Sequence, residues 1–325
     1  MHLGHQEILR HCLREARSNA LKSVAFTFWP HPRRFFHPES QDPKLIFSLD
    51  EKIEFLKQAG FDFIINQSFT ESFSKIEAKD FAEEVLFKRL QADLVVVGRD
   101  FRFGYRARGN PDLLRQLGRF AVLEGKDERV HMGEREQTIS STLIRELIAK
   151  GEMEKVRKAL GFFYFLSGVV GHGAARGAGL GVPTANLDAT RECLPKIGVY
   201  TSMVEDLESG LYFPAATNLG FAPTFHKPSE AFGLKIEPHL LDFNGDLYGR
   251  RLRLYLLSRL RDEREFSSVE LLKAQIHTDL QTTREYFADL NLLQSESAQR
   301  GLSLKSPAAE SQSFEGLKFI QTLSM

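Results

Sequence analysis

The first half of the chain alternates short apolar runs with stretches of helical periodicity. The apolar runs, which we predict to be strands, cover residues 23–28, 61–65, 94–97 and 120–123. Between them, residues 50–59 and 78–90 repeat apolar side chains at helical spacing. Strands that alternate with helices predict a mostly parallel sheet covered on both faces. In such sheets ligands bind beyond the carboxyl ends of the strands, here residues 29–32 and 98–100.

The pattern changes after Phe162. Short alternating runs, separated by Gly and Pro turns, predict strands at residues 166–170, 198–204, 213–219, 234–241 and 251–257. Antiparallel strands without crossover helices favour a small closed barrel. Ser267 then caps a long amphipathic helix. From about Gln294 the chain is rich in Ser and Gln, so we expect a solvated, disordered tail there.

The composition narrows the function classes. The 325 residues suit two domains better than one. The 43 basic and 43 acidic side chains cancel, so net charge gives no support for binding nucleic acid or an acidic membrane surface. No apolar run approaches the roughly 20 residues that cross a bilayer. The two cysteines, Cys12 and Cys193, are too few for a disulfide framework, so we expect a reducing compartment, the cytoplasm.

Two histidines open the first predicted helix. His2 and His5 flank Leu3 and Gly4 at its N-terminus, where backbone N–H groups and the helix dipole attract anions. Gly4 allows a phosphate to approach the backbone. Imidazoles at this place can stabilise charge on an α-phosphate while pyrophosphate leaves, as nucleotidyl transfer requires. A chance pair of histidines near a frayed terminus is the alternative.

A hydroxyl-rich segment begins a later helix. Ser141 and Thr142 follow Ser140 at the predicted helix start, and residues of this type are capping residues first. Arg145 follows one turn later. Hydroxyls, backbone amides and a guanidinium can together bind a polyphosphate.

A loop after the third predicted strand combines aromatic and basic side chains. Residues 97–104 pair phenylalanines with glycines, and Arg102, Arg106 and Arg108 crowd into seven residues. A structural loop is the alternative. The chain holds 27 Phe and a single Trp, which suggests heavily packed cores and a flat pocket for an aromatic ligand.

Four motifs stand in the order and spacing of one family. They are His2-x-Gly4-His5, Phe28-x-Pro30-His31-Pro32, Gly98-x-Asp100-Phe101-x-Phe103-Gly104 and Ser140-Ser141-Thr142-x-Ile144-Arg145. Together they resemble the bacterial bifunctional riboflavin kinase/FMN adenylyltransferases, or FAD synthetases. The resemblance implies an α/β Rossmann-like nucleotidyltransferase domain over residues 1–160. It also implies a six-stranded antiparallel riboflavin kinase β-barrel with a C-terminal helix over 161–292, before a tail at 293–325.

The second half continues the resemblance. Residues 179–186 match the Gly-rich flap and the Pro-Thr-Ala-Asn signature of the kinase module. Glycines let such a loop fold over ATP, and the Thr184 hydroxyl and Asn186 amide oxygen are hard ligands suited to Mg²⁺. It is not a Walker loop, because no Gly-Lys-Ser/Thr follows. A turn-rich β-hairpin is the alternative.

Glu237 is the candidate base of the kinase. It shares one strand face with Lys235 and His239, and Pro238 places this stretch at a barrel edge or mouth. A carboxylate there can accept the proton of the riboflavin 5′-hydroxyl as it attacks the γ-phosphorus of ATP. Spacing alone favours an ordinary exposed glutamate. The family's Glu-x-His-Leu-Leu-Asp-Phe pattern implies the catalytic role.

The resemblance implies a role for each remaining candidate residue. His2 and His5 are catalytic in adenylyl transfer, and Glu237 is catalytic in the kinase. ATP and its phosphates bind Gly4, Ser141, Thr142, Arg145, Gly179 and Gly181. The flavin binds Phe28, His31, Pro32, Asp100, Phe101, Phe103 and Arg261. Mg²⁺ binds Thr184 and Asn186.

The chain departs from the family at its start. The family places a strand and a Gly-x-Phe-Asp-Gly turn directly before His-x-Gly-His, whereas here Met1 directly precedes the motif. We therefore expect the first strand of the sheet to be missing and the adenylyltransferase domain to be incomplete. Either the start codon is assigned too late or that half is impaired, and the intact downstream motifs favour the first explanation.

The expected function is ATP-dependent phosphorylation of riboflavin to FMN and adenylylation of FMN to FAD. We expect small-molecule substrates, no nucleic acid or membrane partner, and a monomer or weak homo-oligomer. Two alternatives remain. In the first, only the kinase is active and the truncated half is a scaffold. In the second, the chain is a non-catalytic flavin-binding regulatory protein.

Overall fold

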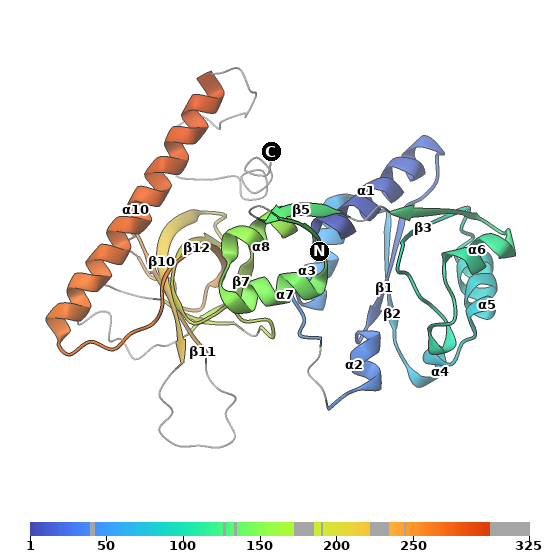
Figure 1. Ribbon diagram of the computed structural model, residues 1–325, viewed down its shortest axis with the longest axis horizontal. Helices are drawn as coiled ribbons and strands as arrows, with labels where there is room; N and C mark the ends of the chain where they lie inside the picture. The colour runs from blue at the N-terminus through green and yellow to red at the C-terminus, as the bar shows by residue number, and fades with distance from the viewer. Residues whose placement is uncertain are drawn as a thin grey trace. The chain divides into compact units, whose positions relative to one another are not determined.

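A computed structural model describes residues 1–39, 43–125, 128–132, 135–171, 185–189, 191–221, 234–243 and 245–299 (Figure 1). The chain divides into two compact units, Met1–Leu143 and Ile144–Met325. The division falls inside helix α7 (Ser141–Lys150).

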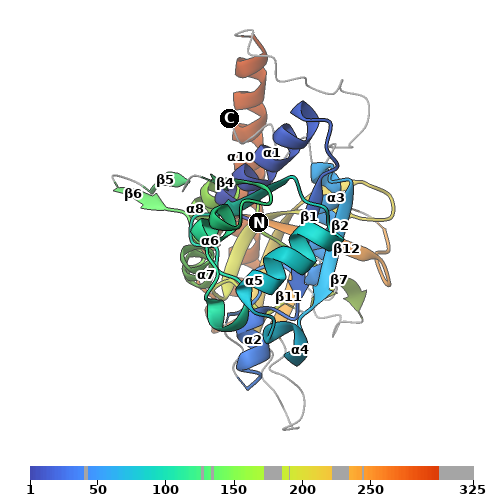
Figure 2. The ribbon, with the colours of Figure 1, turned by 90° about the vertical axis from the view of Figure 1, so that its right-hand side faces the viewer.

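The first unit follows the predicted alternation of strands and helices. Its elements are α1 (Leu3–Ser18), β1 (Val24–Trp29), α2 (Pro32–Phe36), α3 (Leu49–Ala59), β2 (Phe63–Ser68), α4 (Glu71–Ser74), α5 (Ala78–Asp80), the π-helix η1 (Phe81–Arg89), β3 (Leu94–Gly98), the 3-10 helix η2 (Tyr105–Ala107), α6 (Pro111–Leu117), β4 (Ala121–Gly125), β5 (Arg129–Met132) and β6 (Arg135–Thr138). Figure 2 shows this unit turned toward the reader. The predicted parallel pairing is confirmed, because β1 pairs with β2 and β3 pairs with β4, both parallel.

The strands of the first unit form separate pairs. Among the described residues, β1–β2 and β3–β4 are two two-stranded sheets, with no strand hydrogen-bonded between them. The antiparallel hairpin β5–β6 was not predicted. Its second strand, Arg-Glu-Gln-Thr, carries no apolar alternation that could have signalled it.

Local sequence signals set the ends of α3. Ser48 and Glu51 form a capping box, in which the Ser48 hydroxyl accepts from the Glu51 N–H and the Glu51 carboxylate accepts from the Ser48 N–H. Gly60 ends the helix with a left-handed φ of 91°. Leu56 then packs against Leu13 and Ala25, which ties α1, α3 and β1 into one core.

The second unit is the predicted antiparallel barrel. Besides most of α7 it contains α8 (Met153–Leu160), β7 (Phe165–Gly171), β8 (Asn186–Asp188), β9 (Gly198–Asp206), β10 (Tyr212–Phe221), β11 (Leu234–Leu240), β12 (Arg251–Arg261) and α10 (Val269–Gln299). The six strands run in the order β11-β10-β9-β12-β7-β8, and all pairs are antiparallel. Next to β8, the Ala185 N–H donates to the Pro238 carbonyl of β11 over 3.0 Å, which nearly closes the barrel.

Helices α7 and α8 pack within the second unit. Lys196 N–H donates to the Ile148 carbonyl of α7 over 3.3 Å. On α8, Val156 and Ala159 are fully buried, and the helix lies against β12. Most of α7 and all of α8 thus belong to the second compact unit, and the domain boundary expected after residue 160 remains a prediction.

Helix α10 packs across one face of the barrel. Leu280 and Ile276 contact Ala216 and Leu241. The described part of the helix extends to Gln299, past the point near residue 294 where the polar tail was expected to begin. The polar residues at 294–299 did not stop the helix, because Ser, Glu and Gln are tolerated in helices.

A buried ion pair fixes α10 to β12. The Arg261 guanidinium donates to the Asp279 carboxylate through Nε over 3.0 Å and through Nη2 over 2.7 Å. Gln275 also donates to Asp279 over 2.8 Å. Only 8% of the Asp279 side chain is exposed, so its charge depends on these donors.

Replacing Asp279 by asparagine should destabilise the second unit. The change leaves the Arg261 guanidinium half-buried without its counter-charge, and breaking such a pair costs about 3 kcal/mol of unfolding free energy. Urea unfolding followed by circular dichroism measures the loss. The matched control is Asp262→Asn, since 68% of the Asp262 side chain is exposed and its ion pairs contribute little. Equal, small effects of the two substitutions would contradict the assignment.

Candidate active sites

The N-terminus of α1 brings the two predicted histidines together. The imidazoles of His2 and His5 lie 3.9 Å apart between ring centroids. His2 precedes the helix as its N-cap residue, and its buried Nδ1 has no hydrogen-bond partner among the described residues. A Cβ on Gly4 would lie 3.2 Å from that Nδ1, so the glycine allows the ring to fold over the helix start. The unpartnered nitrogen and the exposed dipole end are suited to a phosphate group.

Both imidazoles are neutral at physiological pH. Burial, then repulsion from His5 and the N-terminal amine, lowers the pKa of His2 to about 3. Burial, then repulsion from the N-terminal amine and Lys52, lowers the pKa of His5 to about 4. A bound anion would stabilise the protonated form of each imidazole and so raise its pKa.

The depressed pKa values predict acid sensitivity of the first unit. Unfolding returns both imidazoles to an ordinary pKa of 6.5, so below that pH the unfolded chain binds more protons than the folded one. Stability should therefore fall as the pH drops from about 6.5 toward about 4. Thermal unfolding across this range should show a shallower pH dependence in the His2→Gln/His5→Gln double variant than in the unchanged chain. Identical slopes would contradict the lowered pKa values of the two imidazoles.

Lys52 is a site residue that the sequence did not reveal. Its ammonium donates to the Thr27 hydroxyl of β1, and burial lowers its pKa. It belongs to α3 yet acts electrostatically on His5 of α1. Helical periodicity placed Lys52 on α3 but gave no sign that its side chain turns inward.

The hydroxyl-rich segment lies near the same helix start. Ile139 N–H donates to the Glu128 carbonyl over 2.9 Å, and Glu128 Cβ lies 3.8 Å from the position of a Cβ on Gly4. Ser140 caps α7 by accepting from the Leu143 N–H over 3.2 Å. Ser140 is thus the capping residue of α7. Of the predicted phosphate ligands, Ser141 is half-buried and Thr142 is exposed. Arg145 lies beyond the division between the units.

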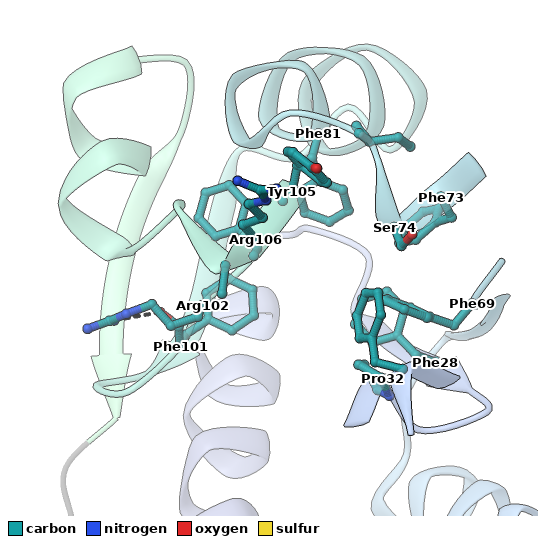
Figure 3. Close-up of a pocket in the computed structure, with 15 residues that line it drawn as sticks. Phe28, Pro32, Phe69, Phe73, Ser74, Phe81, Phe101, Arg102, Tyr105 and Arg106 are labelled. Carbon is teal, nitrogen blue, oxygen red and sulfur yellow. Dashed lines mark hydrogen bonds between the residues drawn. The ribbon is translucent and has the colours of Figure 1, made fainter. Parts of the chain in front are cut away.

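An aromatic cavity of about 450 Å³ lies within the first unit (Figure 3). It is lined by Phe28, Pro32, Phe36, Phe69, Phe73, Ser74, Ile76, Phe81, Phe101, Arg102, Phe103, Gly104, Tyr105, Arg106 and Ala107. Phe101 and Phe103 stack at 5.4 Å and 20°. Phe28 meets Phe69 edge-on at 5.9 Å. Such walls favour a flat aromatic ligand.

The cavity contains four of the six flavin ligands predicted in the first unit. Phe28, Pro32, Phe101 and Phe103 line it. His31 does not: its Nδ1 accepts from the Arg33 N–H over 3.2 Å and caps α2. The side chain of Asp100 is exposed and also lies outside the lining.

The sequence missed several of the rings that line the cavity. Phe69 and Phe73 come from the loop after β2 and from α4, and Phe81 opens η1. These residues belong to none of the motifs. The excess of phenylalanine was the available signal, and it indicated an aromatic pocket without saying which rings form it.

In the second unit, Glu237 lies on β11, which pairs with β10. It pairs directly with Asn218 of β10, so both side chains point to the same face. The neighbouring residues Ile236 and Pro238 are buried, whereas Glu237 is half-buried. The bond from Ala185 to Pro238 brings Asn186, the next residue, beside the strand that carries Glu237.

Arg261 lies in the same lateral row of residues. The register runs from Glu237 to Asn218, then to Val199 of β9 and Arg261 of β12. The Arg261 guanidinium is held by Asp279, and it donates through Nη1 to the Asp262 carbonyl over 3.0 Å. Its contact with the flavin remains a prediction, and its observed partner is α10.

Three predicted ligands lie outside the described residues: Gly179, Gly181 and Thr184. In the part of the chain that the structure describes, no group of three or more His, Cys, Asp or Glu side chains could hold a metal ion. None of the described helices is long and apolar enough to span a membrane.

Comparison with known families assigns each unit to a class of flavin enzyme. Residues 1–143 match the family model for FAD synthetase, and residues 160–287 match that for riboflavin kinase. A nucleotidyltransferase unit is thus followed by a kinase barrel.

Individual relatives match most of the chain. The bifunctional riboflavin kinase/FMN adenylyltransferase of Escherichia coli is 33% identical over 288 residues, covering 88% of this chain and 90% of the relative. That of Buchnera aphidicola is 31% identical over 290 residues, covering 88% and 91%. A crystal structure described as a macrolide-efflux protein from Streptococcus pneumoniae is 31% identical, with a TM-score of 0.78 over 87% of this chain and 90% of that one. The chain belongs to the bifunctional riboflavin kinase/FMN adenylyltransferase family.

Proposed function

We infer that this chain phosphorylates riboflavin to FMN with its barrel and adenylylates FMN to FAD with its first unit, using ATP in both steps. The observation that carries this conclusion is the pair of separate sites in one chain. One has the histidine pair at the start of α1, in the unit that holds the aromatic cavity, and the other has Glu237 on β11, the strand beside which Asn186 lies.

In the kinase step, the riboflavin 5′-oxygen attacks the γ-phosphorus of ATP. An O–P bond forms, the bond from the γ-phosphorus to the bridging oxygen breaks, and ADP leaves. Glu237 accepts the hydroxyl proton. Asn218, its direct neighbour across the strand pair, can hold the carboxylate in position by its amide.

Asn186 is the described barrel residue that would hold Mg²⁺. The Asn186 amide oxygen is a hard ligand at the start of β8, beside the Glu237 strand, and Thr184 would supply a hydroxyl. When bound, the ion would neutralise charge on the ATP phosphates. Asn186 and Thr184 thus orient the triphosphate, and Glu237 handles the proton.

In the adenylyl transfer step, a phosphate oxygen of FMN attacks the α-phosphorus of ATP and pyrophosphate leaves. The α1 N-terminus supplies N–H groups and Gly4 permits close approach. His2 and His5 are neutral and can donate hydrogen bonds to the phosphate oxygens as charge develops. The lining of the cavity holds the isoalloxazine ring.

Incubation with riboflavin, ATP and Mg²⁺, followed by chromatography, tests the proposal. We expect FMN to form first and FAD to follow. FMN without FAD would restrict the activity to the barrel, as in the kinase-only alternative. The absence of both products would contradict the enzymatic function and favour a flavin-binding regulatory protein.

Small-molecule substrates are sufficient for both proposed reactions. The expected cytoplasmic location, the absence of a nucleic-acid partner and the monomeric or weakly oligomeric state remain predictions. Size-exclusion chromatography with light scattering measures the last of these directly.

A further inference from the structure

The charged side chains that line the aromatic cavity are all positive. Its lining contains two arginines, Arg102 and Arg106, and no Asp or Glu. The remaining lining residues are uncharged, and most of them are aromatic. A flat aromatic ligand that also carries an anionic group therefore fits this lining better than a neutral one.

The two arginines differ in their partners. Arg102 donates from Nη1 to the Phe101 carbonyl over 2.9 Å, and in Figure 3 it extends away from Phe28 and Phe69. Arg106 has its guanidinium 5.1 Å from the ring centroid of Tyr105. Across the described residues, its side chain makes no hydrogen bond or ion pair.

The backbone at Arg106 is strained. Arg106 and Ala107 both have left-handed φ angles, 55° and 57°, which cost a residue with a side chain about 1–2 kcal/mol. Strain of this kind persists where the surroundings impose it, and it clusters at ligand sites.

Neighbouring contacts impose this conformation. Phe103 and Gly109 exchange two backbone hydrogen bonds, of 3.2 and 2.8 Å, which close the loop. Tyr105 N–H donates to the Ile76 carbonyl over 2.7 Å. Gly104 has a φ of 72°, and a Cβ there would overlap the backbone of Ala78. The guanidinium is thus presented from a rigid frame.

We propose that Arg106 binds the phosphate of FMN and so selects FMN over unphosphorylated flavins in the adenylyltransferase unit. This assignment rests on the proposed function. A guanidinium matches a phosphate with two parallel hydrogen bonds, and riboflavin offers only a hydroxyl at that position. The reaction needs this preference, because only FMN carries the phosphate that attacks ATP.

The decisive variant is Arg106→Gly. Glycine adopts the left-handed conformation without strain, so the loop should fold at least as well as before. Initial rates of FAD formation from FMN and ATP give KM for FMN. Lumiflavin, which has the ring but no chain to phosphorylate, serves as a competitive inhibitor that reports on ring binding alone. We expect KM for FMN to rise about tenfold to a hundredfold and the inhibition constant of lumiflavin to stay unchanged.

The control is Arg108→Gly, which removes an equal charge from the same loop at a residue that does not line the cavity. It should leave KM for FMN unchanged. An unchanged KM in Arg106→Gly, or equal weakening of FMN and lumiflavin, would overturn the proposal. If the unchanged chain makes no FAD, the proposed function fails. Equilibrium binding of FMN and lumiflavin, measured by fluorescence quenching, then still decides the role of Arg106.

Discussion

Replacing Glu237 by glutamine is expected to lower the rate of riboflavin phosphorylation by about 10²–10⁴-fold. Glutamine keeps the size and the hydrogen-bonding shape of the side chain but cannot accept the proton of the attacking hydroxyl. Glu237 is half-buried beside Asn218 on β10, so the substitution should fit without repacking the barrel. Conversion of riboflavin to FMN, followed by chromatography, measures the effect.

The same variant should form FAD normally when FMN is supplied, because that reaction belongs to the first unit. Glu208→Gln is the matched control, since Glu208 is exposed in the turn between β9 and β10. An unchanged rate of phosphorylation in Glu237→Gln would remove Glu237 from the mechanism. An equal loss in both variants would indicate a general effect of charge.

Replacing His5 by alanine should lower FAD formation from FMN by about 10²–10³-fold, the usual cost of removing one donor to a developing oxyanion. The neutral imidazole lies against His2 at the start of α1, where the transferred α-phosphate would bind. Riboflavin phosphorylation should stay unchanged, because the barrel carries its own base.

His11→Ala provides the control on the same helix. His11 lies two turns further along α1, with Nε2 3.5 Å from the Glu15 carboxylate. The His11→Ala substitution should reduce neither riboflavin phosphorylation nor FAD formation. Retention of FAD formation in His5→Ala would contradict the assignment of the α1 N-terminus as the nucleotidyl transfer site.

Much of the fold could be predicted from periodicity. Period-two alternation identified the barrel strands, and helical periodicity located α3 to within one residue of its observed start. The hairpin β5–β6 was missed because β5 is short and β6 is polar throughout, so its pairing depends on the neighbouring strand. Periodicity showed that α8 has an apolar face but not what covers that face, and the structure packs it against β12.

The candidate sites were predictable where a motif is short and local. His2 and His5 meet because three residues span nearly one helical turn, and Phe101 and Phe103 share one loop. Lys52 and Phe69 reach the sites only through tertiary packing. For the same reason Arg261, expected at the flavin, could not be foreseen as the partner of Asp279.

The central claim is that one chain performs two phosphorus transfers from ATP onto one flavin, and isotopic labelling tests it most directly. Riboflavin is incubated with ATP labelled at the γ-phosphorus or, separately, at the α-phosphorus, and the flavins are separated by chromatography. The account predicts that FMN carries only the γ label and that FAD carries the label from both experiments. FMN without the γ label, or FAD that lacks the label in one of the two experiments, would contradict it.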